Sequence, residues 1–401
     1  MRKPGTEHTH LIWDSMMHTP EMLKDCLAEP ILGDIERVAD RLAEMAPRRV
    51  FCAGTGSSAY ASIVHALALE ELARLSSSWH VTSELGAYPP VHIGPESILI
   101  LTSHSGRTLG DLQVVARARQ QGTYTIGVTD IPDSPLAQAV DDVIIGPGGR
   151  KTELPATRTY TTAMFRVLQL ATSLAKRLDD ADKLHPADKL HPSDVAATYE
   201  KKLRELPHIL RAFIDRFSPQ AADYVDRLAD VERYIVIGAG PNMSTAFEGA
   251  LVLLQSTDAA AQAFQVEEML HGPIQALRPG TCVVAVAAPG PLQERILQAA
   301  RACHVIGATV LTIAPEDTSR PEDADIHISV PAQVPELLTP VLYIVPFWLI
   351  GYRFALATGR DPDNLSRNRE EFKRAFQLLM PGDARFDRPT DAVYPPAPNG
   401  S

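Results

Sequence analysis

Short apolar runs and longer stretches of mixed polarity alternate along this chain in two similar series. Runs rich in Val, Ile and Leu are typical of strands buried on both faces, and the stretches between them have helical periodicity. In the first series, strands are expected at 49–53, 80–82, 97–102, 123–128 and 142–145. Helices are expected at 35–45, from the turn after the first strand to residue 75, and at 109–121 and 159–178.

The second series follows a helical stretch at 193–217 and repeats the same order. Strands are expected at 234–238, near Ala263, and at 281–287, 309–313 and 326–330, with helices at 243–257, 291–304 and 337–357. Strands that alternate with helices favour parallel sheets covered on both sides. The sequence therefore predicts the α/β class, with two doubly wound, flavodoxin-like domains in tandem.

Composition changes mark the expected domain boundaries. We expect an N-terminal helical extension (1–34), a first domain (35–180), a linker with a connecting helix (181–217), a second domain (218–357) and a C-terminal lid or tail (358–401). The linker carries a tandem copy of Ala-Asp-Lys-Leu-His-Pro, at 181–186 and 187–192, which is typical of a tolerated insertion rather than a metal site. The tail is rich in proline beyond Pro381, and 361–376 is a candidate lid over the site.

The charge balance argues against nucleic acid and membrane partners. The 401 residues carry 49 acidic and 38 basic side chains, a net charge of −11, with no long basic block. The first residues are polar, and no window approaches the roughly 20 apolar residues of a membrane span. The four cysteines are scattered and are expected to be reduced. We expect a cytoplasmic protein without a metal or cofactor.

The most informative motif follows the apolar run Ile98–Leu101 and reads Thr-Ser-His-Ser-Gly-Arg-Thr, at 102–108. Hydroxyls and backbone N–H groups between a buried strand and a helix N-terminus form a favourable anion site. The motif therefore predicts a phosphate cradle. The alternative is a Ser/Thr-rich turn that caps its helix and binds nothing.

Two glycine turns follow the first strand of each series, Gly54-Thr55-Gly56 and Gly238-Ala239-Gly240. Both are only fragments of a dinucleotide-binding fingerprint, because the third glycine and a placed acidic residue are missing. A nucleotide-dependent oxidoreductase is thus a minor third hypothesis.

Several motifs, in order along nearly the whole chain, resemble the proteins with two sugar isomerase (SIS) domains. The chain is especially similar to the isomerase half of glutamine–fructose-6-phosphate amidotransferase. The matching positions are Gly54-Thr55, Ser83-Glu84, the segment 103–108, the segment 157–162, Glu248-Gly249-Ala250-Leu251, His271-Gly272-Pro273 and Arg367-Asn368. The resemblance implies a phosphosugar bound in the first domain and a homodimer with shared active sites.

Binding residues follow from the same resemblance. Thr55, Ser103, Ser105 and Thr108 are expected to hold the phosphate, with Gly56 in the turn beside them.

Three further binding positions depart from the pattern or remain open. His104 stands where relatives often have glutamine, and could donate to the phosphate or be a spectator. Ala156 stands where a serine is common, so one hydrogen bond to the sugar should be absent. Arg158 is expected to stabilise its loop or to reach an acidic group of the ligand.

The expected catalytic positions are partly substituted. His271 matches the family histidine that assists ring opening, commonly in the neighbouring subunit's site. Gln255 stands where isomerising relatives carry a glutamate, and an amide cannot shuttle a proton. Val252 and Glu371 stand where lysines are expected. The candidate substitute bases are Glu248, Glu267, Glu268 and Glu371, of which Glu268 adjoins the histidine motif. Alternatively, Glu248 only braces its helix and the pair Glu267-Glu268 only begins one.

The expected function is an enzyme acting on a phosphorylated amino sugar or sugar–amine conjugate, as an isomerase, deaminase or deglycase. No glutamine-hydrolysing domain is expected, because no long segment precedes the first domain. The alternative is a phosphosugar sensor that has lost catalysis, which the substitutions favour and His271 disfavours.

Overall fold

The computed structural model describes residues 9–151, 153, 155–178, 192–257 and 259–379. The tandem hexamers, apart from Pro192, and the proline-rich tail lie outside this range, so the predictions made for them are not tested.

The first sheet has five parallel strands in the order β2-β1-β3-β4-β5. Its strands are β1 Arg49–Gly54, β2 Ser77–Val81, β3 Ser97–Thr102, β4 Tyr124–Thr129 and β5 Asp142–Ile145. Its helices are α3 Ile31–Met45, α4 Ser57–Glu71, α5 Thr82–Ala87, α6 Leu109–Gln120, α7 Pro135–Ala139 and α8 Arg158–Arg177. Cys52 of β1 pairs with Ile100 of β3, which pairs with Ile126 of β4, so an apolar row crosses the sheet.

The second sheet repeats this topology, in the order β10-β9-β8-β6-β7, again with parallel strands. Its strands are β6 Arg233–Gly238, β7 Ala260–Gln265, β8 Thr281–Val286, β9 Thr309–Pro315 and β10 Ile326–Val330. Its helices are α10 Ala221–Arg227, α11 Asn242–Ser256, α12 Val266–Leu270, α13 Gln293–Ile306, α14 Pro340–Tyr343 and α15 Val345–Ala357, with 3-10 turns at Pro273–Ala276 and Glu336–Leu338. The predicted α/β class with two tandem doubly wound sheets is confirmed.

Two expectations about helices are wrong. The helix expected to reach residue 75 ends at Glu71. The single helix expected over 337–357 is divided into a 3-10 turn, α14 and α15, because Pro340 and Pro346 have no N–H to donate and each stands in the first turn of a new helix.

The expectation that no apolar window approaches a membrane span is also wrong. Residues 336–357 form a 22-residue stretch that contains an 18-residue window of mean hydropathy 1.5, and this stretch is long and apolar enough to cross a membrane. However, 83% of the window is buried inside the protein, where it packs in the core of the second domain. The apolar character of residues 336–357 is therefore explained by their place in the protein core.

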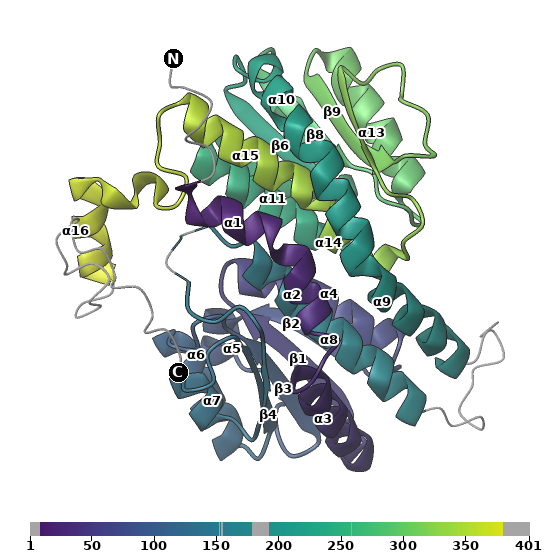
Figure 1. Ribbon diagram of the computed structural model, residues 1–401, viewed down its shortest axis with the longest axis vertical. Coiled ribbons are helices and arrows are strands. Elements are labelled where there is room, and N and C mark those ends of the chain that lie inside the picture. Colours follow the sequence, from purple (N-terminus) through teal and green to yellow (C-terminus); the bar gives the residue numbers. More distant parts are fainter. Residues whose placement is uncertain (1–8, 152, 154, 179–191, 258, 380–401) are drawn as a thin grey trace.

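The two sheets lie at opposite ends of the molecule, and helices between them form a continuous apolar core (Figure 1). The connecting helix α9 (Pro192–Phe217) runs alongside both halves. Tyr60 of α4 stacks on Phe247 of α11 at 5.3 Å. Tyr160 of α8 shares a 2.6 Å hydrogen bond with Ser244, whose hydroxyl lies 2.6 Å from the carbonyl of Tyr60. These contacts fix α11 of the second domain against α4 and α8 of the first.

The N-terminal extension also forms helices, α1 (Leu11–Met17) and α2 (Thr19–Asp25). The Asp363 carboxylate accepts from the amides of Leu11 and Ile12, at 3.1 and 2.8 Å, and so satisfies the start of α1. A 3-10 turn (Leu365–Asn368) and α16 (Glu370–Leu379) follow, and α16 projects from the body (Figure 1). The lid role of 361–376 stays a prediction.

Candidate functional site

A cavity of about 150 Å³ opens at the carboxyl ends of β1, β3 and β4. It is lined by strand ends (Thr102, His104, Val128, Asp130), by the turn and helix after β1 (Thr55, Ser57, Ser58, Ala61), by the loop before α8 (Lys151, Ala156) and by α8 (Thr159, Tyr160, Ala163, Arg166). After β1 the chain crosses to β2 on one side of the sheet, and after β3 it crosses to β4 on the other side. Such a switch point is where doubly wound sheets bind ligands.

The loop of the predicted phosphate cradle is held rigidly beside this cavity. Gly106 has φ +60°, and a Cβ there would lie 2.4 Å from the Ser134 hydroxyl, so only glycine fits. The amide of Ser103 donates to the carbonyl of Val128 at 3.0 Å, and the Thr129 hydroxyl donates to the carbonyl of His104 at 3.0 Å. The α6 N-terminus follows, with its first N–H groups unpaired within the helix.

The hydroxyl groups of the cradle meet at a buried carboxylate. Asp111, in the first turn of α6, accepts a hydrogen bond from the Thr55 hydroxyl at 3.4 Å. Burial raises the pKa of Asp111, and the neighbouring hydroxyl groups of Ser103, Thr82, Thr108 and Thr55 partly oppose the rise. To hold a phosphate, the Thr55 hydroxyl proton must turn from Asp111 to the ligand, which needs only rotation about a C–O bond.

The predicted binding residues occupy two positions relative to the cavity. Thr55, His104 and Ala156 line it. The others lie in adjoining turns: Gly56 has φ +58° before α4, Ser103 is buried, and the Ser105 Oγ accepts from the Arg107 amide at 3.4 Å.

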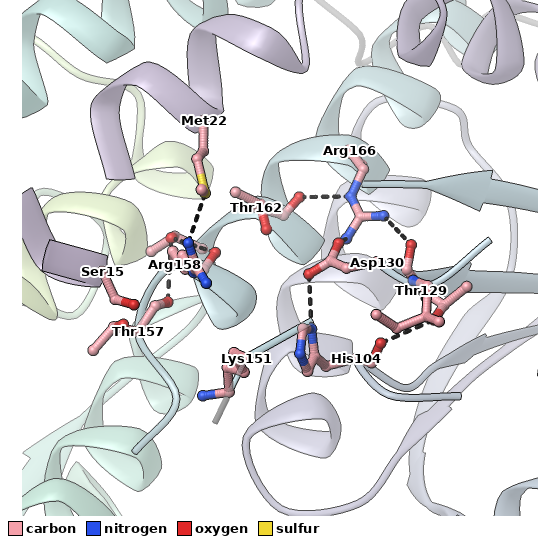
Figure 2. A network of polar contacts seen from close by, with 12 residues as sticks. Ser15, Met22, His104, Thr129, Asp130, Lys151, Thr157, Arg158, Thr162 and Arg166 are labelled. Carbon is pink, nitrogen blue, oxygen red and sulfur yellow. Dashed lines mark hydrogen bonds and ion pairs between the residues drawn. The ribbon is translucent and has the colours of Figure 1, made fainter. Parts of the chain in front are cut away.

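A buried ionic network supports one wall of the cavity (Figure 2). Nδ1 of His104 lies 2.9 Å from Asp130 Oδ2, and Nη2 of Arg166 lies 2.7 Å from Asp130 Oδ1. Because a carboxylate only accepts, His104 donates from Nδ1 and its Nε2 is the remaining ring nitrogen. Burial alone would raise the pKa of Asp130, but Arg166 and His104 outweigh it and hold the pKa below its ordinary value.

Arg166 is saturated with acceptors although it is buried. It donates to the carbonyls of Thr129 and Ile144 at 2.9 Å and of Thr162 at 3.1 Å, besides Asp130. Sequence reasoning missed this residue. The sequence could have indicated it, because Arg166 stands within the apolar helical stretch 163–171 and a buried charge needs a partner.

The second domain contributes a carboxyl group beside the cavity. Glu248 of α11 is fully buried, and its Oε1 accepts from the Ser57 hydroxyl at 3.0 Å. Its Oε2 has no partner among the described residues. Burial raises the pKa of Glu248 to about 8, against weaker opposing effects of Ser57 and Lys151. A carboxyl with such a pKa can give and take a proton near neutral pH.

The loop before α8 and the first residue of this helix bring two cations to the same region (Figure 2). Lys151 Nζ donates to the Pro155 carbonyl at 2.8 Å. Arg158 Nη2 lies 3.9 Å from Glu153 Oε1, and Glu153 accepts from Ser15 of α1 at 2.6 Å. The N-terminal extension therefore braces the loop through Glu153, which fits the loop-stabilising interpretation of Arg158.

None of the four candidate catalytic residues lines the cavity, although Glu248 contacts Ser57, which does. Gln255 lies on α11, half-buried and about 10 Å along the axis from Glu248. His271 follows α12 and is exposed, with Nδ1 2.8 Å from the Glu267 carbonyl. Glu268 is exposed beside it.

Among the described residues, no group of three or more His, Cys, Asp or Glu side chains could hold a metal ion. The four cysteines are buried and unpaired with one another.

The fold and the site define a two-domain α/β protein with a ligand cavity at a switch point. The sequence pattern of the SIS domain matches residues 45–173 and 227–356. The chain therefore belongs to the SIS domain family, with two such domains in tandem.

Relatives and solved structures agree with this assignment. The isomerizing glutamine–fructose-6-phosphate aminotransferase of Thermus thermophilus is 30% identical over 324 residues, which are 80% of this chain and 52% of that protein. The chain thus spans about half the length of this curated relative. The C-terminal domain of the Francisella tularensis glucosamine–fructose-6-phosphate aminotransferase superposes with a TM-score of 0.78 at 20% identity, covering 90% of this chain and 99% of that one.

A Thermotoga maritima glucosamine-6-phosphate deaminase has the same fold, with a TM-score of 0.67 at 19% identity over 88% of this chain and 97% of that one.

Proposed function

We propose that this protein binds a phosphorylated sugar in the first-domain cavity and converts it, as an isomerase, deaminase or deglycase of an amino sugar or sugar–amine conjugate. The observation that carries the proposal is the placement of Glu248. This fully buried carboxyl group, whose pKa is raised to about 8, lies beside a cavity that opens next to a phosphate-type loop. The names of the relatives, an aminotransferase acting on fructose 6-phosphate and a glucosamine-6-phosphate deaminase, support the same substrate class.

The proposed roles are the following. Ser103, Ser105, Thr108 and Thr55 take the phosphate oxygens at the α6 N-terminus. Isomerising relatives carry a proton-transferring glutamate at the position that Gln255 occupies here, and an amide cannot transfer a proton. Glu248 takes over this transfer. We propose a cytoplasmic homodimer in which His271 of one subunit completes the site of the other, because His271 is exposed and does not line the cavity of its own chain.

Replacing Ser103 with alanine should weaken the binding of hexose 6-phosphates by roughly tenfold, because one hydrogen bond to a charged ligand is lost. The matched control is Ser218→Ala, at a half-buried position of the 3-10 turn after α9. Calorimetric titration measures both variants with a hexose 6-phosphate and with the unphosphorylated hexose. An equal loss for both sugars would contradict a phosphate role for Ser103.

Replacing His271 with alanine should lower turnover by about tenfold or more while leaving the dissociation constant nearly unchanged, because an acid–base group acts on the transition state. Amine release and aldose–ketose exchange are followed with amino-sugar phosphates and fructosamine phosphates. Mixing H271A with a variant that lacks Glu248 should restore part of the activity in mixed dimers. Unaltered turnover in H271A would contradict its role.

A phosphosugar sensor is the second candidate, favoured by the position of Gln255 outside the cavity. Stabilisation of the protein by sugar phosphates without any turnover would select the sensor.

A further inference from the structure

Lys151 lines the cavity, but the function proposed above gives it no task. Its Nζ donates to the carbonyl of Pro155 on its own loop, at 2.8 Å. The salt bridges of the described residues do not include it, although four charged groups face it: Glu153 and Arg158 from its own segment, Glu248 from α11 and Asp130 from the end of β4. A lysine at a cavity wall that is not neutralised by an ion pair is available to a ligand.

The surroundings of Lys151 favour its neutral form. Burial lowers the pKa of the ammonium group to about 8; Glu153 opposes this and Arg158 adds to it. In a usable fraction of the molecules, the Lys151 side chain is therefore a free amine near neutral pH. A desolvated lysine beside another cation is a recognised way to make an amine nucleophilic.

An acid for the same chemistry is in place. The Glu248 carboxyl is buried, its Oε2 has no partner among the described residues, and it interacts electrostatically with Lys151 across the domain interface. In Figure 2 the ammonium end of Lys151 points away from His104, so the amine and the imidazole do not share one hydrogen-bonding position.

We infer that Lys151 is a catalytic amine that attacks the carbonyl carbon of an open-chain sugar phosphate and holds the sugar as an imine. The inference rests on the proposed function and narrows its substrate class to sugars with a free carbonyl group in the open-chain form.

The step balances without any further reagent. The nitrogen lone pair forms the C–N bond, the carbonyl π electrons move to oxygen, and one N–H proton is transferred to that oxygen. The Glu248 carboxyl then protonates the hydroxyl, which leaves as water while the C=N bond forms. The remaining N–H proton returns to Glu248. Amine and carbonyl become imine and water, and no atom is oxidised or reduced.

The alternative task for Lys151 is to hold an anionic group of the ligand. Arg158, where the same loop enters α8, already supplies a permanent positive charge, whereas Lys151 is neutral part of the time at the pH of the cell. The two roles differ in one respect that can be tested. Arginine can replace a lysine that holds an anion, but it cannot form the imine.

The test uses the full chain with fructose 6-phosphate and sodium cyanoborohydride, which reduces an imine to a stable secondary amine. We expect one adduct per chain, mapped by peptide mass spectrometry to Lys151, formed at least tenfold faster than with fructose. Its rate should rise between pH 6 and 8, as the amine loses its proton. Lys151→Arg should give no adduct, and Lys176→Arg, at an exposed lysine paired with Glu200, should react as wild type.

Thermal stabilisation by fructose 6-phosphate separates the outcomes. If the sugar phosphate stabilises wild type and K151R but no adduct forms at Lys151, the inference is wrong and the binding proposal stands. If K151A loses the stabilisation, K151R restores it and neither wild type nor K151R is labelled, Lys151 is an anion ligand and the inference is again wrong. If no stabilisation occurs at all, the proposed function itself fails.

Discussion

Replacing Arg166 with methionine should lower the free energy of unfolding by about 3–5 kcal/mol, because a buried charge would lose its partner. Asp130 is fully buried, and among the described residues its carboxylate would keep only the hydrogen bond from His104. The carbonyls of Thr129 and Ile144 would lose their bonds to Nη1 as well. The loss of these buried hydrogen bonds adds to the cost.

The matched control is Arg177→Met on the same helix, because Arg177 is partly exposed and pairs with Glu36 and Asp40 at the surface. That variant should lose about 1 kcal/mol or less. Urea unfolding measures both variants. Adding Asp130→Asn to R166M should recover part of the loss, because the unpaired charge is then removed. Equal losses for R166M and R177M would show that the network contributes nothing special to stability.

Replacing Glu248 with glutamine should stabilise the protein at pH 8 while abolishing most of its turnover. The pKa of Glu248 is about 8 in the folded state against 4.5 when exposed, so the unfolded chain releases this proton at lower pH. Wild type therefore loses stability as the pH rises from about 4.5 to 8, and glutamine does not titrate. The advantage of E248Q should grow over this range, to roughly 4 kcal/mol at most. Turnover should fall by about 10²–10⁴, the usual contribution of a general acid–base group.

Urea unfolding of both proteins at pH 5 and pH 8 measures this divergence. Glu267→Gln is the control, because Glu267 is partly exposed in a surface pair with Arg295 and its pKa is lowered, chiefly by the hydrogen bond from that arginine. It should show no stability gain that grows with pH. A constant difference between E248Q and wild type at the two pH values would contradict the buried, proton-holding state of Glu248.

Much of the fold could be predicted from the sequence, because strands buried on both faces are read directly from apolar runs. The strands 97–102, 142–145 and 326–330 have the predicted bounds. The helices within the apolar stretch 337–357 were harder to predict. Pro340 and Pro346 each fit the first turn of a helix, but each interrupts a helix that would continue through it.

The site could be predicted only in part. The position of the phosphate-type loop follows from local order, a strand, then small residues, then a helix. The contacts that surround it join positions far apart along the chain: 36 residues separate Arg166 from Asp130, and 191 separate Ser57 from Glu248. Periodicity carries no information about such pairs. Lys151 was missed for a different reason: a lone lysine in a loop is ordinarily solvated, so its position along the chain gave no sign of a cavity.

The most direct test of the central claim is a crystal structure of the protein with a bound hexose 6-phosphate. We predict that the phosphate lies against the loop 103–108 and the α6 N-terminus, with the sugar directed toward Lys151 and Glu248. A phosphate bound elsewhere, or a cavity that stays empty at saturating ligand, would contradict the account.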